Sequence, residues 1–192
     1  MSKLLVAGLG LMGGSLAAAA TAVGWEVHLH HRRPAPAEEA ARRGWGRITP
    51  LAEALAVCDL AVVCPPVPVV VAEVRRLAAF PGRAVITDVG SIKGPLCADL
   101  TDLARAGRYV GSHPMCGSHQ SGIAAADPAL YRNALTIVTP GGATPAAIAA
   151  VEGLWQSVGC RLLRMEPEAH DRAMGAASHL PHLAASAVAA QL

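Results

Sequence analysis

Three glycines near the N-terminus have a spacing that bears directly on chemistry. Residues 8–13 read Gly-Leu-Gly-Leu-Met-Gly and follow a short apolar run at 3–7. In the pattern G-x-G-x-x-G the first glycine permits a tight turn, the second lets backbone amides approach a pyrophosphate, and the third lets the next helix pack closely on its strand. The N–H groups at the start of that helix then face the phosphates. The alternative is a glycine-rich turn without a ligand. We predict a dinucleotide site formed by Gly8, Leu9, Gly10, Leu11, Met12 and Gly13.

The end of the next predicted strand, at 25–31, indicates which dinucleotide binds. A site for NAD places Asp or Glu there, about 20 residues past the glycines, to bind the ribose 2′-hydroxyl. Residues 31–33 are instead His-Arg-Arg, and the next acid is Glu38. A guanidinium group can pair with a 2′-phosphate in bidentate fashion, whereas a carboxylate would repel it. We predict NADP in preference to NAD, with Arg32 as the main contact and Arg33 as the second. The alternative is a solvated basic corner, because further arginines follow at 42, 43 and 47.

Histidine and hydroxyl side chains are concentrated in the segment 111–122. It contains His113, Ser118, His119 and Ser121 together with three glycines. This composition is typical of a flexible loop rich in hydrogen-bonding groups rather than of a core segment. His113 is a candidate base, because an imidazole with an ordinary pKa near ~6.5 can accept a proton at neutral pH. The alternative is a histidine that only bonds the loop backbone.

A second polar group lies on the long helix predicted at 167–192. Steps of four residues place His170, Ser178 and His182 on one stripe, and Asp171 and His179 on the neighbouring stripe. Polar stripes on a helix otherwise rich in Ala and Leu need solvent or a wet cleft. A water-facing helix side is one alternative. A metal site formed by the acid and the last two histidines is another, but H-E-x-x-H is absent from the sequence and we expect no metal.

Strand and helix patterns alternate along the chain up to residue 165. This order, with Gly, Pro and Asp at the joints, predicts an α/β fold with a doubly wound, mostly parallel sheet and helices on both faces. Ligands of such sheets bind outside the carboxyl ends of the strands, so Cys64, Pro65 and Ser91 are expected beside the cofactor. The predicted strands are 3–7, 25–31, 59–64, 84–88, 108–111, 135–139 and 160–164; the predicted helices run from the glycine turn to 23 and over 35–43, 50–57, 67–79, 93–106 and 144–157.

Composition excludes several other classes of protein. The chain has 192 residues, 53% of them hydrophobic and 16% charged. This length and composition predict one folded domain with room for an appended element, rather than a disordered chain. A net charge of +2 without a basic run interleaved with aromatic residues argues against nucleic acid as a partner. The longest apolar stretches, 60–72 and 183–190, are too short to span a membrane. Five cysteines without a C-x-x-C pair indicate reduced thiols in a cytoplasmic protein.

The motifs taken together resemble a known family, the prephenate/arogenate dehydrogenases of tyrosine biosynthesis. The similarity follows the whole chain in one order, and the two histidine motifs are more specific than the glycine turn. The motifs that carry the similarity are Gly-Leu-Gly-Leu-Met-Gly-Gly-Ser at 8–15, Thr-Asp-Val-Gly-Ser-Ile-Lys at 87–93, Gly-Ser-His-Pro-Met-Cys-Gly at 111–117, Thr-Pro at 139–140, Pro-Glu-Ala-His-Asp at 167–171 and Ser-His-Leu-Pro-His at 178–182.

The resemblance implies an NAD(P)-dependent oxidative decarboxylation of prephenate to 4-hydroxyphenylpyruvate, or of arogenate to tyrosine. His113 matches the catalytic histidine of the family. Ser91 matches the serine that orients this histidine and approaches the nicotinamide. The resemblance places five further residues, beside His113 itself, on the substrate side: Ser118, Asp171, Ser178, His179 and His182.

The resemblance also implies two domains and a homodimer. Residues 1–165 correspond to a Rossmann-type dinucleotide-binding domain, and residues 166–192 to the first helix of a helical dimerisation domain. That domain continues beyond the position of Leu192 in the family and supplies an arginine that clamps a substrate carboxylate. We therefore expect a truncated chain that binds dinucleotide but turns over weakly or not at all.

Two other functions are compatible with parts of the pattern. One is a binding module that keeps the glycine turn, senses NADP and has lost its chemistry. The other is a different NADP-linked oxidoreductase of the same fold group, acting on a hydroxy acid or an imine. The second would not need His113 together with the Ser-His-Leu-Pro-His motif at 178–182.

Overall fold

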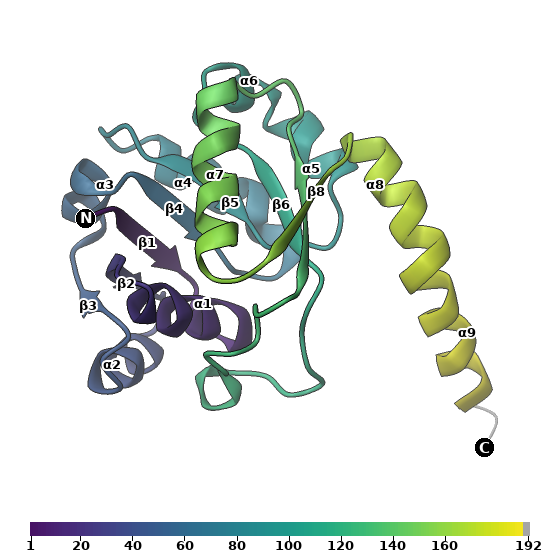
Figure 1. Ribbon diagram of the computed structural model, residues 1–192, viewed down its shortest axis with the longest axis horizontal. Helices are drawn as coiled ribbons and strands as arrows, with labels where there is room; N and C mark the ends of the chain where they lie inside the picture. The colour runs from purple at the N-terminus through teal and green to yellow at the C-terminus, as the bar shows by residue number, and fades with distance from the viewer. Residues whose placement is uncertain (190–192) are drawn as a thin grey trace.

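The alternating pattern of the sequence builds a five-stranded parallel sheet. The computed structural model describes residues 1–189, apart from the side chains of His179, His182, Ala184 and Val188. The strands lie in the order β3-β2-β1-β4-β5, with every neighbouring pair parallel (Figure 1). Their bounds are β1 Lys3–Ala7, β2 Glu26–His30, β3 Arg47–Ile48, β4 Leu60–Val63 and β5 Val85–Asp88.

Helices cover both faces of this sheet, as the prediction of a doubly wound fold requires. Alternate strand residues point to opposite faces, so Leu4 packs with one core and Leu5 with the other. Helices α1 Leu11–Ala22, α2 Pro34–Arg42 and α7 Pro145–Ser157 cover the first face. The second face is covered by α3 Leu51–Val57, α4 Val70–Ala78, α5 Gly94–Asp99 and α6 Thr101–Arg105. The predicted α/β architecture is confirmed.

A smaller sheet extends the structure beyond β5. It has the order β6-β7-β8, with β6 antiparallel to β7 and β7 parallel to β8. A parallel bridge between Ile86 and Tyr109 joins the two sheets. The bounds of its strands are β6 Gly111–Pro114, β7 Leu135–Thr139 and β8 Arg161–Arg164.

Three details differ from the sequence prediction. The strand predicted at 108–111 begins only at Gly111, and the first four residues of the predicted flexible loop form β6. The helix predicted at 93–106 is divided into α5 and α6 at buried Leu100, whose ψ of 14° is not helical. Two-residue β3 and the short helix η2 Ile123–Ala125 were not predicted, because they are too short to show a periodic pattern, and the helix predicted at 67–79 begins as the short helix η1 Val67–Val69.

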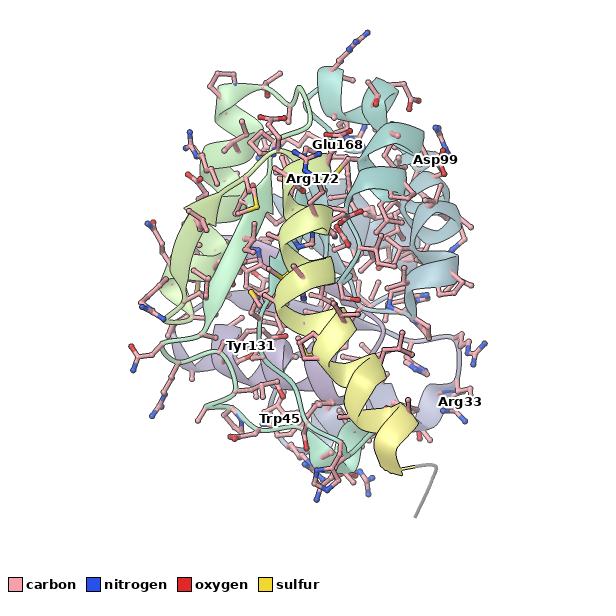
Figure 2. The ribbon with its side chains drawn as sticks, turned by 90° about the vertical axis from the view of Figure 1, so that its right-hand side faces the viewer. Arg33, Trp45, Asp99, Tyr131, Glu168 and Arg172 are labelled. Carbon is pink, nitrogen blue, oxygen red and sulfur yellow. The ribbon has the colours of Figure 1, made fainter. Side chains whose placement is uncertain are left out.

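The C-terminal segment is a helix that projects from the body of the molecule. It consists of α8 Pro167–Met174, a π-helical turn η3 Gly175–His179 and α9 Leu180–Ala189. Figure 1 shows its far end standing away from the sheets. In Figure 2 the helix lies across the side that faces the viewer, with Glu168 and Arg172 labelled near its start. The π turn ends two residues before Pro181, which has no N–H to donate to the preceding turn. No helix in residues 1–189 is long and apolar enough to cross a membrane.

Candidate active site

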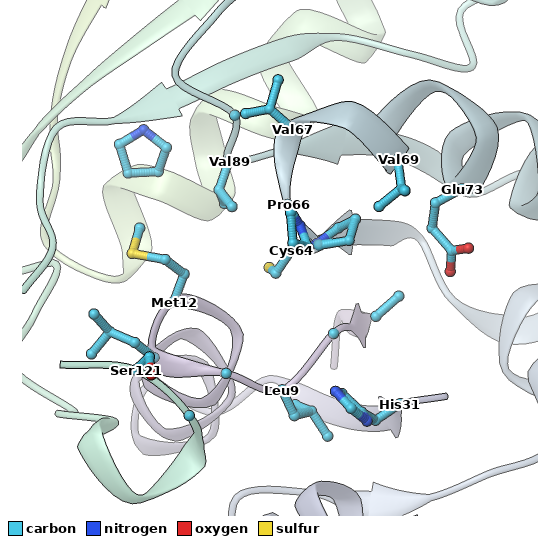
Figure 3. Close-up of a pocket in the computed structure, with 18 of the residues that line it drawn as sticks. Leu9, Met12, His31, Cys64, Pro66, Val67, Val69, Glu73, Val89 and Ser121 are labelled. Atoms are coloured by element: carbon cyan, nitrogen blue, oxygen red, sulfur yellow. The ribbon is translucent and has the colours of Figure 1, made fainter. Parts of the chain in front are cut away.

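The site lies where the chain leaves β1 and β4 in opposite directions. These strands are neighbours at the centre of the sheet, and a crevice outside their carboxyl ends is the usual ligand position of such folds. A cavity of about 990 Å³ opens there (Figure 3). It is lined by most of the predicted cofactor-binding residues: Gly8, Leu9, Gly10, Leu11, Met12, Arg32, Cys64, Pro65 and Ser91.

Each of the three motif glycines is required, or leaves space, for a different steric reason. Gly8 has a φ of +100°, which L side chains rarely adopt. A Cβ on Gly13 would lie 1.8 Å from the carbonyl oxygen of Gly8, so only glycine lets α1 start this close to the turn. A Cβ on Gly10 would meet no atom within 4 Å and would project into open space. Gly13 therefore shapes the turn from behind, whereas Gly10 keeps room for a ligand.

The start of α1 fits the diphosphate of a dinucleotide. Helix α1 begins at Leu11 after Gly10, and among the described residues no side chain caps its first turn. The backbone N–H groups of that turn are thus available to an anion at the cavity wall. Two contacts hold this helix end in place: Tyr131 Oη donates to the Met12 carbonyl at 2.8 Å, and Ser15 Oγ accepts from the Asp127 N–H at 2.9 Å.

The opposite end of the cavity carries mixed charge. His31 and Arg32, at the end of β2, line it together with Glu73 and Arg76 of α4. Figure 3 shows His31 and Glu73 at one side of the cavity, away from Met12 and Ser121. Arg76 pairs with Glu73 at 2.6 Å, so the carboxylate is already engaged by a cation. The sequence reasoning named Arg32 but missed the two α4 residues, since their pairing with this end depends on the crossover from β4.

The structure does not bring Arg33 into this cavity. Its side chain lines a separate surface hollow with Glu39, Arg42 and Arg43. The Arg33 N–H donates to Nδ1 of His31 at 3.1 Å, so the residue acts on the cavity only through its backbone. Arg33 is also the residue that precedes the first turn of α2, and its backbone is extended.

The third wall of the cavity holds the candidate catalytic pair. Ser91, in the loop after β5, and His113, in β6, both line it and are both partly buried. The position of β6 is fixed by Ser112, whose hydroxyl donates to the Asp88 carbonyl at 2.6 Å and accepts from Trp155 Nε1 at 3.1 Å. The central expectation, an imidazole at position 113 beside the dinucleotide crevice, agrees with this placement.

A buried ion pair lies directly behind the candidate base. Lys93 and Asp88 are both fully buried, and their ammonium and carboxylate groups are in contact. The Asp88 carboxylate also accepts from Tyr109 Oη at 2.8 Å and from the Gly90 N–H at 2.8 Å. Lys93 Nζ donates in addition to the carbonyl of Ser112 at 2.9 Å. Paired and hydrogen-bonded in this way, the two charges fix the backbone that carries His113.

The residues predicted for the substrate side are less closely gathered. Ser118 and Ser178 are exposed, and neither is among the described residues that line the cavity. Asp171 faces the Lys93 and Gly94 N–H groups and His170. The side chains of His179 and His182 lie outside the described residues.

His170 and Lys93 are functional candidates that the sequence reasoning missed. His170 is fully buried, and its Nε2 lies 2.9 Å from Nδ1 of His113. The sequence placed it on the helix stripe but gave no reason to choose it over its neighbours. The described side chains contain no group of three His, Cys, Asp or Glu residues able to hold a metal ion. The alternative metal site involving His179 and His182 falls outside that description.

Comparison with known proteins gives a consistent picture over the full chain. Residues 17–164 match the family model described as prephenate dehydrogenase, nucleotide-binding domain. Residues 166–192 match that of the prephenate dehydrogenase dimerization domain.

Two curated relatives match nearly the whole chain. A cyclohexadienyl dehydrogenase of Zymomonas mobilis is 31% identical over 188 residues, 95% of this chain and 64% of that protein. A prephenate dehydrogenase of Lactococcus lactis is 28% identical over 194 residues, 97% of this chain and 52% of that protein. A prephenate dehydrogenase of Bacillus subtilis is 41% identical over 110 residues, 56% of this chain and 29% of that protein. This chain thus spans less than two thirds of the length of these relatives.

Solved structures agree with these matches. A prephenate dehydrogenase from Aquifex aeolicus, in complex with hydroxyphenyl propionate and NAD+, superposes with a TM-score of 0.89 at 30% identity, over 100% of this chain and 69% of that one. An arogenate dehydrogenase from Synechocystis gives a TM-score of 0.88 at 26% identity, over 98% of this chain and 68% of that one. With the family models matched from residue 17 onward, the chain belongs to the prephenate dehydrogenase family.

Proposed function

We propose that this protein is a dehydrogenase that oxidatively decarboxylates prephenate, or its amino-acid counterpart arogenate, with NADP as the hydride acceptor. The observation that carries the proposal is the cavity that joins the glycine turn to Ser91 and His113. A cradle for phosphates and a candidate base thereby face one space. The curated prephenate and cyclohexadienyl dehydrogenases in the same family support the substrate class.

The chemistry needs one hydride acceptor and one proton acceptor. The ring substrate carries a hydroxyl at C4 and a carboxylate at C1. A dinucleotide bound at the glycine turn would supply the acceptor for the C4 hydride. The hydroxyl proton passes to His113, the bond from C1 to the carboxylate breaks as CO₂ leaves, and its electron pair makes the ring aromatic. The ring oxygen then takes the proton back, which yields the phenol and restores the neutral base.

The residues of the chain divide the work by position. The start of α1 binds the diphosphate, His113 holds and returns the proton, and Ser91 lies on the same wall, where we assign it to orienting the imidazole and contacting the nicotinamide. Ser118, Ser178, His179 and His182 remain proposed substrate-side residues on the strength of the motifs they belong to. The contacts of Asp171 support a different role, developed below.

Replacement of the base tests the activity. The His113→Asn variant of the full-length protein should lose turnover by about 10²–10⁴-fold, as expected for removal of a general base, while the Kd for NADP stays the same. Turnover is measured as nicotinamide reduction and CO₂ release with prephenate and arogenate, each with NADP and NAD. Unchanged turnover in the variant would show that His113 is not the base. No turnover by the unaltered full-length protein would favour a binding module without this chemistry.

The proposed preference for NADP depends on Arg32. Its side chain lines the cavity at the end of β2, where a site for NAD would carry an acid. The Arg32→Ser variant should bind NADP about 10- to 100-fold more weakly, because one charge-assisted contact to the 2′-phosphate is lost, and should bind NAD unchanged. The Arg33→Ser variant is the matched control, since that side chain lies in a different hollow. Tighter binding of NAD than of NADP by the unaltered protein would contradict the preference.

A cytoplasmic homodimer is the proposed setting. Residues 166–192 match the dimerization-domain model, and α9 exposes Leu180 and Leu183 at 63% and 67% of their surface. Exposed apolar side chains on a projecting helix favour burial against a second copy. All five cysteines are free thiols, which suits a reducing compartment. Light scattering on the full-length protein tests the dimer, and a monomeric mass would contradict it.

A further inference from the structure

Three side chains from two distant segments form a chain of contacts that ends at the candidate base. Nδ1 of His113 lies 2.9 Å from Nε2 of His170. Nδ1 of His170 lies 2.7 Å from Oδ1 of Asp171. The same Oδ1 accepts the Lys93 N–H at 2.7 Å, and Oδ2 accepts the Gly94 N–H at 2.8 Å. The segment after β5 therefore anchors the carboxylate, and the carboxylate anchors the two rings.

The direction of each hydrogen bond follows from what each group can donate. An ionised carboxylate only accepts, so Nδ1 of His170 carries the hydrogen in its bond to Asp171. In a neutral ring the other nitrogen, Nε2, then holds a lone pair and accepts. Nδ1 of His113 must donate to it. His113 in its neutral form consequently has its lone pair on Nε2, the nitrogen able to take a substrate proton.

The carboxylate is held in its ionised form by its surroundings. Partial burial raises the pKa of Asp171, but the Lys93 N–H, the His170 ring and the Gly94 N–H lower it further, and the net direction is downward. A Cβ on Gly94 would lie 2.9 Å from Oδ2 of Asp171, so this close approach requires glycine at that position. The anchor is therefore built by two backbone N–H groups and one glycine.

The middle ring has no freedom to reverse these bonds. His170 is fully buried, and its ring meets that of His113 edge to face, with centroids 5.1 Å apart and an interplanar angle of 70°. A ring held at both nitrogens by fixed neighbours cannot flip without losing both contacts, because the flip places ring carbons where the nitrogens were. Together with the buried pair of Lys93 and Asp88 behind Ser112, this packing fixes both the position and the tautomer of the base.

We propose that His170 and Asp171 are positioning residues that fix His113 with its proton on Nδ1 and its lone pair on Nε2. In this arrangement the negative carboxylate also stabilises, through His170, the positive charge that His113 gains when it takes the substrate proton. No proton has to reach Asp171. The consequence for turnover rests on the proposed function, whereas the tautomer itself does not, and so the two can be tested apart.

Nitrogen NMR of the histidine rings tests the tautomer directly. In the unaltered protein, labelled with nitrogen-15 histidine, Nδ1 of His113 should show the shift of a protonated nitrogen and Nε2 that of an unprotonated one. The His113→Asn variant assigns the signals. A proton on Nε2 and none on Nδ1 would overturn the proposal, whatever the activity of the protein.

Kinetics of two His170 variants test the consequence. The His170→Phe variant removes the acceptor and should lower kcat about 10- to 100-fold, with KM and the Kd for NADP nearly unchanged. The His170→Gln variant restores an acceptor oxygen and should recover part of the loss. The His28→Phe variant is the control, because His28 is also a buried histidine, at 1% exposure, but bonds Thr49 outside the cavity.

The possible failures are distinguishable. The expected tautomer without oxidation of either ring substrate would count against the proposed function alone. A His170→Gln variant as impaired as His170→Phe, or a His170→Phe variant with unchanged kcat, would overturn the positioning role.

Discussion

At the phosphate end of the cavity the contacts come from main-chain atoms of one short turn, whereas at the imidazole end they come from side chains of distant segments. Gly8, Gly10 and Gly13 act through the side chains they lack. Nδ1 of His113 contacts the ring of His170, 57 residues later in the chain. Asp171, which binds that ring, accepts the N–H of Lys93, 78 residues earlier. Backbone recognition can be encoded in six consecutive residues. A positioned base needs the tertiary structure of the whole domain.

The difference predicts that the two ends respond to different kinds of substitution. A change in the glycine turn acts by steric conflict and alters cofactor binding or the turn itself. A change at the imidazole end removes a charge or a hydrogen bond from a buried network. The buried partner that is left without its contact then lowers the stability of the folded state.

The largest effect is expected from breaking the buried ion pair. The Lys93→Met variant leaves the Asp88 carboxylate buried without its cation and should lower the free energy of unfolding by about 3–5 kcal/mol. The Arg75→Ala variant is the control, because Arg75 and Asp102 form an exposed pair whose loss should cost far less. Urea unfolding measures both. Equal losses would mean that the buried pair behind His113 contributes no more to the stability of the fold than an exposed pair does.

The two glycines at the other end should separate folding from binding. The Gly13→Ala variant places a Cβ 1.8 Å from a backbone carbonyl and should destabilise the protein by about 3 kcal/mol, the upper end of ordinary overpacking. The Gly10→Ala variant meets no atom within 4 Å and should unfold like the unaltered protein. It should nevertheless bind NADP at least about tenfold more weakly, since the new methyl group keeps phosphate from the backbone N–H groups. Thermal unfolding and calorimetric titration check the pair, and a reversed pattern would refute it.

A smaller effect with a pH signature is expected at Tyr109. Burial, and then the charge of Asp88, raises the pKa of this phenol well above its ordinary value. Below about pH 10 both folded and unfolded states keep the proton, so the contribution to stability is constant there. As pH rises further only the unfolded state ionises, and stability falls. The Tyr109→Phe variant should lose about 2 kcal/mol at neutral pH, with its hydrogen bond to the carboxylate.

The urea midpoint, measured as a function of pH above neutrality, gives the second readout for this variant. Stability of the Tyr109→Phe variant should decline less steeply above about pH 10 than that of the unaltered protein. Tyr131 and the buried cysteines, whose pKa values are also raised, remain in both proteins and account for the residual slope. An identical alkaline decline would mean that Tyr109 is not held in its neutral form by the fold.

The same contrast explains how much the sequence could predict. Most strands of the parallel sheet, the doubly wound order and the glycine turn were predictable, because their signals are local: apolar runs, helical periods and one spaced motif. The strand that carries His113 was not, since its glycines and polar residues resemble a loop. What makes residues 111–114 a strand is pairing with β7, together with the hydroxyl of Ser112, which bonds the Asp88 carbonyl and the Trp155 indole.

Site residues divide along the same line. Arg32 was predicted from the absence of an acid after the second strand, and it lines the cavity. Arg33 was grouped with it because spacing alone cannot tell which of two adjacent side chains turns outward. Asp171 was assigned to the substrate by motif, but its oxygens accept from Lys93, Gly94 and His170. Glu73 and Arg76 line the cavity from α4, the helix that follows β4, and Arg76 Nη2 lies 3.3 Å from Nε2 of His30 at the end of β2.

The central claim is that one dinucleotide extends along the cavity from His31, past the glycine turn, to His113. The two histidines report on it, because His31 lines the cavity beyond β2 and His113 lies on the wall beyond β5. When NADP is titrated into protein labelled with nitrogen-15 histidine, the ring signals of both should shift with the same midpoint, while buried His28 stays unmoved. A shift of His31 alone, with His113 unaffected at saturation, would contradict the account.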